Sequence, residues 1–318
     1  MKTKLNILKY SLSALVVGIL IYYITSNDAN LKLIKSIQFF DILVALIIAV
    51  LAFVISGIQT GYILYKDSSV KLKTGDYLVL PVMMHLWGYI LPTQGGLLFS
   101  SFYLSKKYGY RFSSGYSLGF YTFLVGLIIS GLIGLYFSLS SVPFNLPLLF
   151  ISMAVVLSPL FLFVGRNIFR SVNIKIKLIQ KILTTIETVT NNILNHLKER
   201  SYNVFIVGTT FVSIIIYIIW LVWATHTLDL SLTLPQMIML TLATRLSLIV
   251  RFIPGNLGVQ EMFAASGVAI VGGSFDDAIL ISVFLRFIGL LLAITIGVLG
   301  MAINSKYFSF REILNTKL

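Results

Sequence analysis

The sequence has no cysteine, only three histidines and few charged residues for its length. Charged residues make up 11% of the 318 positions, whereas soluble domains carry about a quarter. Without cysteine there are no disulfides, thiolate metal sites or cysteine nucleophiles. His85, His196 and His226 are scattered and lack the spacing of a metal-binding motif. We therefore expect no metal, no cofactor and no soluble globular fold.

Acidic residues are much scarcer than basic ones, and the formal net charge is +13. The lysines and arginines lie between apolar runs, which is typical of membrane proteins whose basic loops orient them and contact anionic headgroups. We expect membrane lipid, and not nucleic acid, as the partner.

Apolar runs fill most of the chain, which is 58% hydrophobic. A bilayer core of about 30 Å needs roughly 20 apolar residues in a helix. Six segments come close to that length: 8–25, 42–65, 116–139, 146–164, 204–225 and 278–301. The sequence thus predicts an all-α polytopic membrane protein with about six full transmembrane helices, forming a single membrane domain over 1–318.

Two further apolar stretches, 77–105 and 235–271, are each interrupted by proline and glycine. The break at 91–96 contains Pro92, Gln94, Gly95 and Gly96, and the break at 253–258 contains Pro254, Gly255, Asn256 and Gly258. Proline and clustered glycine end helices, and bare backbone at membrane depth must lie within protein or line a wet cavity. Each stretch is therefore either a kinked crossing or a re-entrant helical hairpin.

The distribution of basic residues distinguishes these two alternatives. With two re-entrant hairpins and a cytoplasmic N-terminus, only Lys32 and Lys35 of the loop cations lie outside. With two kinked crossings, the basic loops 105–115 and 166–203 would lie outside. The positive-inside rule therefore favours re-entrant hairpins, with both termini on the cytoplasmic side of the cell membrane.

The regions 77–139 and 235–301 resemble each other as two halves of a repeat. Pro92 aligns with Pro254, Gln94 with Asn256, and Gly96 with Gly258. Because three predicted crossings separate the hairpins, the two would enter the membrane from opposite sides. This is the inverted-repeat architecture of many transporters. The alternative is that both tips only shape helix packing.

Four ionisable residues lie at membrane depth: Arg245, Arg251, Glu261 and Arg286. A charge at the centre of a membrane helix costs at least ~2.5–3.5 kcal/mol, so these residues should face a cavity or a partner. Their excess positive charge suits a phosphate or other anion, with Gln94 and Asn256 adding neutral hydrogen bonds. The alternatives are a structural ion pair between Glu261 and an arginine, and an Arg251 that snorkels to the interface.

Apolar residues recur at three- and four-residue spacing over 174–200, between flanking lysines. This pattern predicts an amphipathic cytoplasmic helix on the membrane surface, or a docking surface for a cytoplasmic enzyme.

The segment 253–261, followed by Gly272-Gly273 and the helix that carries Arg286, resembles the flippase-like membrane region of bacterial lysylphosphatidylglycerol synthases. That family typically carries Pro-Gly-Gly-x-Gly-x-x-Glu, which is matched here by Pro254, Gly255, Gly258 and Glu261, while Asn256 replaces a glycine. The resemblance implies lipid translocation or handling of a lipid headgroup. Fused members add an aminoacyltransferase domain for which this chain leaves no room, so we expect no lipid aminoacylation.

These features favour a flippase or transporter for an anionic or polyprenyl-linked lipid. Two alternatives are a membrane-embedded lipid-modifying transferase and a non-catalytic partner of a cytoplasmic lipid- or glycan-modifying enzyme. An enzyme of the first kind needs a general base and usually a metal, and Glu261 is the only acid at depth. We therefore predict no catalytic residues.

Overall fold

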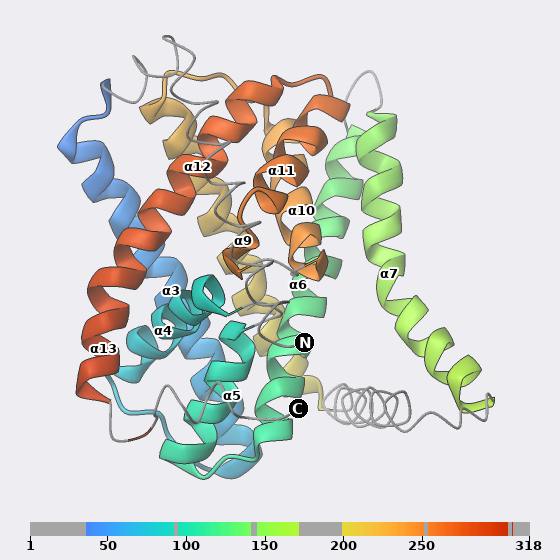
Figure 1. Cartoon of the computed structure of the whole chain (residues 1–318). Coiled ribbons are helices and arrows are strands. Elements are labelled where there is room, and N and C mark those ends of the chain that lie inside the picture. The colour runs from blue at the N-terminus through green and yellow to red at the C-terminus, as the bar shows by residue number, and fades with distance from the viewer. Residues whose placement is uncertain are drawn as a thin grey trace, which may run out of the picture.

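Helices make up all the regular structure that is described (Figure 1). The computed structural model describes residues 36–91, 95–140, 145–171, 199–250, 254–304 and 307, and gives the backbone alone for 159–171, 250 and 254. In chain order the helices are α3 (Phe39–Ser68), α4 (Asp76–Ile90), α5 (Gly95–Tyr108), α6 (Phe112–Ser140), α7 (Leu146–Ser171), α9 (Arg200–Thr227), α10 (Leu234–Ser247), η1 (Leu248–Val250), η2 (Pro254–Asn256), α11 (Val259–Ile270), α12 (Phe275–Leu292), the π-helix η3 (Ala293–Gly297) and α13 (Val298–Ile303).

Four helical segments are long and apolar enough to cross a membrane: α3, α6, α9 and the continuous α12–η3–α13. They contain the predicted segments 42–65, 116–139, 204–225 and 278–301, and the predicted segment 146–164 lies within α7. The all-α membrane architecture is thus confirmed. The predicted crossing at 8–25 and nearly all of the predicted amphipathic helix at 174–200 lie outside the described residues.

The outward faces of these helices carry large apolar side chains. Ile47 on α3, Phe150 on α7 and Val204 on α9 are each more than half exposed. Such surfaces are unfavourable in water and favourable in lipid, so they are expected of helices that face acyl chains. The chain is an integral membrane protein.

The two interrupted stretches fold back on themselves as helical hairpins. In the first hairpin, α4 and α5 pack so closely that a Cβ on Gly96 would lie 2.4 Å from the carbonyl oxygen of Met84. In the second, a Cβ on Gly267 of α11 would lie 2.8 Å from the Cβ of Ala243 on α10. Small residues allow this close backbone approach in membrane proteins.

The hairpins lie at opposite ends of the molecule. Figure 1 shows α4 and α5 in the lower part and α10 and α11 in the upper part, with both tips directed toward the middle. The last helical segment, from α12 to α13, runs past both hairpins and contacts α11 near one end and α4 near the other. This arrangement brings the tips of two distant segments together.

Candidate functional site

The two hairpin tips meet at Gly255. The short helix η2 packs against α4, and a Cβ on Gly255 would lie 3.0 Å from Cδ1 of Tyr89. Gly255 has a φ of 66° and Gly258 a φ of 77°, which are left-handed conformations that glycine adopts without steric cost. The glycines in this break therefore permit both the tight turn and the close approach to the first hairpin.

An ion pair lies directly behind this tip. The Nε atom of Arg286 on α12 is 2.9 Å from Oε1 of Glu261 on α11, and the two side chains are 7% and 1% exposed. The other carboxylate oxygen, Oε2, accepts a hydrogen bond of 2.8 Å from the backbone N–H of Gly258. Glu261 thus caps its own helix and fixes Arg286 at the same time.

Arg286 also contacts the side chain of Gln260, the residue directly before Glu261. Its Nη2 atom donates to Oε1 of Gln260 at 2.9 Å and lies 3.5 Å from the carbonyl oxygen of Asn256. Its Nη1 atom is buried and makes no hydrogen bond within the described part of the chain. A buried guanidinium N–H without an acceptor is costly, so this atom favours an incoming oxygen ligand.

Asn256 is held at the tip through its side-chain amide. Its Nδ2 atom donates to the carbonyl oxygen of Ser247 at 2.9 Å and lies 3.1 Å from the Ser247 hydroxyl. These bonds connect the turn to the end of α10, so Asn256 stabilises the left-handed turn in which it has a φ of 53°.

Arg245 places a second guanidinium near the first. It lies on α10 and faces α6, where a Cβ on Gly126 would come within 2.4 Å of its Nη1 atom. Tyr217 of α9 lies close enough to interact electrostatically with both Arg245 and Arg286. Because Glu261 pairs with Arg286, the described group of charges remains positive.

A cavity of about 180 Å³ opens where the hairpins meet. Its polar lining comes from Ser56 on α3, His85 and Tyr89 on α4, and Gln260 on α11. Gly96 of the first hairpin and Gly255 of the second also line it. Since Gln260 also bonds Arg286, the cavity and the ion pair form one continuous site.

A family model described as the lysylphosphatidylglycerol synthase TM region matches residues 6–297 of the sequence. The chain belongs to this family. The family is a membrane domain associated with lipid modification or movement, and the resemblance inferred from the second motif is therefore confirmed. No curated protein and no solved structure matches the chain.

In this lysylphosphatidylglycerol synthase TM region, the structure brings together some of the residues predicted from sequence. Glu261, Arg286 and Asn256 are in one cluster, and Tyr217 interacts electrostatically with both Arg286 and Arg245. Among the predicted tip residues, Gly95 and Gly96 begin α5, and Gly255 and Gly258 form the turn before α11. Pro92, Gln94 and Arg251 lie outside the described residues, and the side chain of Pro254 is not described.

Two residues of the site were missed by sequence reasoning. Gln260 was not selected because, unlike Gln94 and Asn256, it lies outside the two proline and glycine breaks. His85 was considered as a metal ligand, for which its spacing to the other histidines is unsuitable. Its ring lies edge-on to both Phe53 and Tyr89, and it also lines the cavity.

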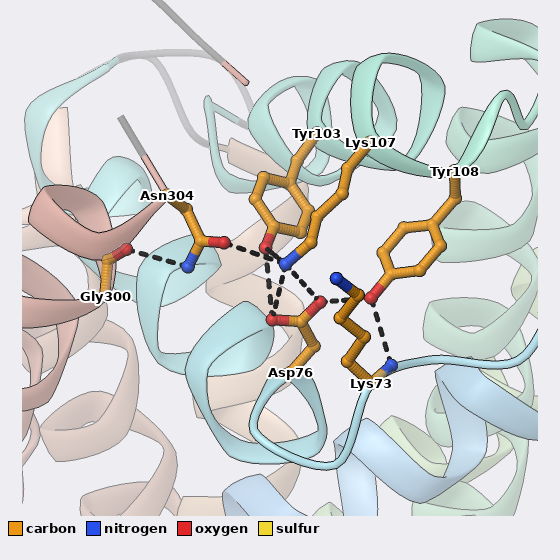
Figure 2. A network of polar contacts seen from close by, with 7 residues as sticks. All are labelled: Lys73, Asp76, Tyr103, Lys107, Tyr108, Gly300 and Asn304. Carbon is orange, nitrogen blue, oxygen red and sulfur yellow. Dashed lines mark hydrogen bonds and ion pairs between the residues drawn. The ribbon is translucent and has the colours of Figure 1, made fainter. Parts of the chain in front are cut away.

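The base of the first hairpin carries a second polar cluster in this family member (Figure 2). Asp76 forms an ion pair of 2.7 Å with Lys107 and accepts hydrogen bonds from the hydroxyls of Tyr103 and Tyr108. Lys107 also donates to Oδ1 of Asn304 at 2.8 Å. The cluster thus joins the two ends of the hairpin to the end of α13.

Aromatic rings surround the same ammonium group. The Nζ atom of Lys107 lies 5.1, 5.6 and 5.2 Å from the ring centroids of Tyr103, Tyr108 and Tyr307. Beside this cluster, burial and the Asp67 carboxylate raise the pKa of Tyr110, which donates to Asp67 at 2.7 Å. Lys107 is paired with the Asp76 carboxylate and surrounded by aromatic rings within the fold. We therefore assign this cluster a structural role, which is to hold together the two ends of the first hairpin.

Proposed function

We propose that this chain moves an anionic or polyprenyl-linked phospholipid across the cell membrane. One observation carries the proposal: two hairpins from opposite ends of the molecule meet at a polar cavity lined by Gln260, whose side chain accepts a hydrogen bond from Arg286. Transporters with inverted repeats bind their substrates at such discontinuous helices near the midplane.

The proposed topology has six crossings, with the hairpins re-entering from opposite sides as halves of an inverted repeat. The basic end of α5 and the start of α9, with Lys106 and Arg200, lie at the lower end of Figure 1. The positive-inside rule makes that end cytoplasmic, together with both termini and the amphipathic segment 174–200. The first hairpin then enters from the cytoplasm and the second from outside.

In this proposal the arginines hold the phosphate. Arg286 offers its unpaired Nη1 atom, and Arg245 adds a second positive charge that, like Arg286, interacts electrostatically with Tyr217. Gln94 in the first break and Arg251, just before the second, would complete the set. Glu261 orients Arg286 and keeps the net charge low enough to be tolerated at membrane depth.

We infer transport without catalysis by this chain. A carboxylate that acts as a general base needs a free oxygen within reach of the reacting group. Glu261 is the only carboxylate at membrane depth, and its two oxygens face Arg286 and the N–H of Gly258.

Movement of fluorescent anionic lipid in reconstituted liposomes tests the proposal. Arg286→Ala and Glu261→Ala, reconstituted at equal amounts of folded protein, should lose about tenfold or more of the rate, as expected for loss of a charge-assisted bond. Lys106→Ala is the matched control because this cation is exposed and lies at the hairpin base. Wild-type rates in both site variants would exclude the proposed site.

A further inference from the structure

We propose that His85 is a proton-binding site in the wall of the cavity between the hairpin tips, and that the cavity holds an anion more tightly when His85 is protonated. This inference rests on the proposed function, because the anion is the phosphate of the lipid that would occupy the cavity. It adds a response to pH to that site, and it gives a role to a histidine that the proposed function does not use.

His85 lies one turn before Tyr89 on α4, the helix that leads to the first tip. Its ring centroid is 5.3 Å from that of Phe53 on α3 and 4.8 Å from that of Tyr89, and both contacts are edge-on. Such contacts favour one orientation of the imidazole. The side chain is only half-buried and lines the same cavity as Gln260, so it is within reach of a ligand there.

A glycine on the last helical segment leaves room for the ring edge that carries Nε2. A Cβ on Gly289 of α12 would lie 3.0 Å from Nε2 of His85 and 3.5 Å from the hydroxyl oxygen of Tyr89. Gly289 follows Arg286 by three residues, so the two positions are neighbours on the surface of α12. Arg286 in turn donates to Gln260 in the cavity wall. His85 therefore approaches the part of α12 that carries the proposed phosphate-binding arginine.

Few charges of the described elements face His85. Helix α4 packs against α3, α5, η2, η3, α12 and α13, of which η2, η3 and α13 contain no ionisable side chain. From α3, Phe53 contacts the ring and Ser56 lines the cavity. From α12 comes Arg286, whose charge is paired with Glu261 of α11. The other ionisable side chains of these helices, apart from Tyr89, lie in their first or last two turns: Asp41, Tyr62, Tyr65, Lys66 and Asp67 of α3, Asp76 and Tyr77 of α4, Tyr103, Lys106, Lys107 and Tyr108 of α5, and Asp276 and Asp277 of α12. A proton on His85 would therefore add positive charge to the cavity wall.

The two forms of an imidazole differ in what they offer to an anion. The neutral ring has one N–H donor and one acceptor nitrogen, whereas the protonated ring has two donors and a positive charge. A charge-assisted hydrogen bond to a phosphate oxygen is roughly twice as strong as a neutral one. Since imidazole exchanges its proton between about pH 5 and 8, the affinity for the anion should fall as the pH rises through this range. By linkage, binding of the anion should favour uptake of a proton.

Lipid binding by the purified full-length protein at two pH values tests the inference. The protein is titrated in detergent with radiolabelled phosphatidylglycerol at about pH 5.5 and at about pH 8, which lie on either side of the ordinary imidazole range. The phosphodiester of this probe keeps one negative charge at both values. We expect the wild type to bind the probe about tenfold more tightly at the acidic pH, which is the effect of one charge-assisted hydrogen bond.

Three substitutions assign the response to one histidine. His85→Gln keeps a polar side chain that does not titrate, so it should bind equally at both pH values, with about the wild-type affinity at alkaline pH. His85→Arg stays charged throughout and should keep the higher affinity at both. His226→Gln is the matched control, because His226 is exposed at the end of α9, stacks on Trp223 and does not line the cavity. It should respond to pH as the wild type does.

A measurement on the wild type alone keeps the inference testable if a His85 variant does not fold. Titration calorimetry in two buffers with different heats of ionisation, at about pH 6.5, should show net uptake of protons as the lipid binds.

Three results would overturn the inference: equal wild-type affinity at both pH values, a pH response that persists in His85→Gln, or lipid binding without proton uptake. Lipid movement in liposomes is measured in parallel. Binding that ignores pH, together with normal lipid movement, would sink this inference and leave the proposed function standing. A pH response that depends on His85, without lipid movement, would do the reverse.

Discussion

Arg286 connects three parts of the second hairpin through one side chain. It pairs with Glu261, donates to Gln260 and approaches the carbonyl oxygen of Asn256 at the tip. A buried ion pair is costly to break from one side, because the remaining charge has neither water nor a partner. Arg286 and Glu261 therefore maintain the tip as well as serving the proposed ligand.

This mutual dependence predicts strong coupling between the two residues. Arg286→Ala and Glu261→Ala should each lower the free energy of unfolding by about 3–5 kcal/mol, whereas the double variant should lose clearly less than the sum. Denaturant unfolding in mixed micelles measures all three variants. Additive losses would mean that the two charges do not depend on each other.

Gly126 provides the space for the second guanidinium. A methyl group there would lie 2.4 Å from Nη1 of Arg245, the flexible end of that side chain, so Gly126→Ala should displace the guanidinium. The helix itself should tolerate alanine, which is favoured over glycine by about 1 kcal/mol. We predict little change in melting temperature but a several-fold loss of lipid movement in liposomes.

Gly208→Ala is the control for this substitution. Gly208 lies on α9, another long apolar helix, and a Cβ there meets nothing within 4 Å. Its variant should keep the wild-type rate. A Gly126→Ala protein that moves lipid as fast as the Gly208→Ala protein would remove Arg245 from the site.

At the residue scale, the charged residues of the site could be predicted from the sequence more readily than its neutral polar residues. Glu261 and Arg286 were found because ionisable residues are so rare in the apolar runs. Gln260 could not be separated from other polar residues without knowing that Arg286 lies beside it. The pairing of Asp76 with Lys107 was also missed, since the two meet only because the hairpin folds back.

The helical hairpins are the elements on which the site depends. Proline and glycine in both interrupted stretches predicted where each helix ends, and the structure has α10 and η1 before the second break and α11 after it. Sequence alone left a kinked crossing and a hairpin as alternatives, because helix length fits both. The close packing of α4 with α5 and of α10 with α11 depends on tertiary contacts.

A glycine pair on the second hairpin tests whether contact between the tips matters. Gly255 and Gly272 both have left-handed φ values, 66° and 80°, so alanine at either position costs about 1–2 kcal/mol of backbone strain. Only at Gly255 would the new methyl group meet the first hairpin, 3.0 Å from Tyr89.

We therefore predict similar stability losses but different functional losses for these two variants. Gly255→Ala should reduce lipid movement in liposomes several-fold more than Gly272→Ala, because only the former pushes the tips apart. Equal rates for the two variants would show that contact between the tips is not needed.

The last helical segment was predicted as one continuous crossing, but it contains a five-residue π-helix, η3. This π-helix lies between Arg286, which holds the second hairpin, and Asn304, which contacts the base of the first. The local change in hydrogen bonding leaves no mark in an apolar pattern, so sequence could not reveal it. Its position between the two attachment points is typical of π-helices near functional sites.

The whole molecule places its two hairpins at opposite ends around one central cavity. The internal resemblance and the charge of the loops predict hairpins that enter the membrane from opposite sides, and this stays a prediction. Figure 1 shows the two hairpins at opposite ends of the molecule. The cavity itself could not be predicted from the sequence, because no single motif forms it. Its lining residues come from α3 and from both hairpins. Lipid movement through this cavity therefore requires the two hairpins to enter the membrane from opposite sides.

Labelling of single introduced cysteines on intact cells tests this claim most directly, since the chain has no cysteine of its own. Lys106→Cys marks the base of the first hairpin, and Asp276→Cys the first turn of α12, which follows the second; both positions are exposed. With a membrane-impermeant maleimide, we predict labelling of Asp276→Cys on intact cells and of Lys106→Cys only after the membrane is opened. Labelling of both positions from the same side would contradict the account.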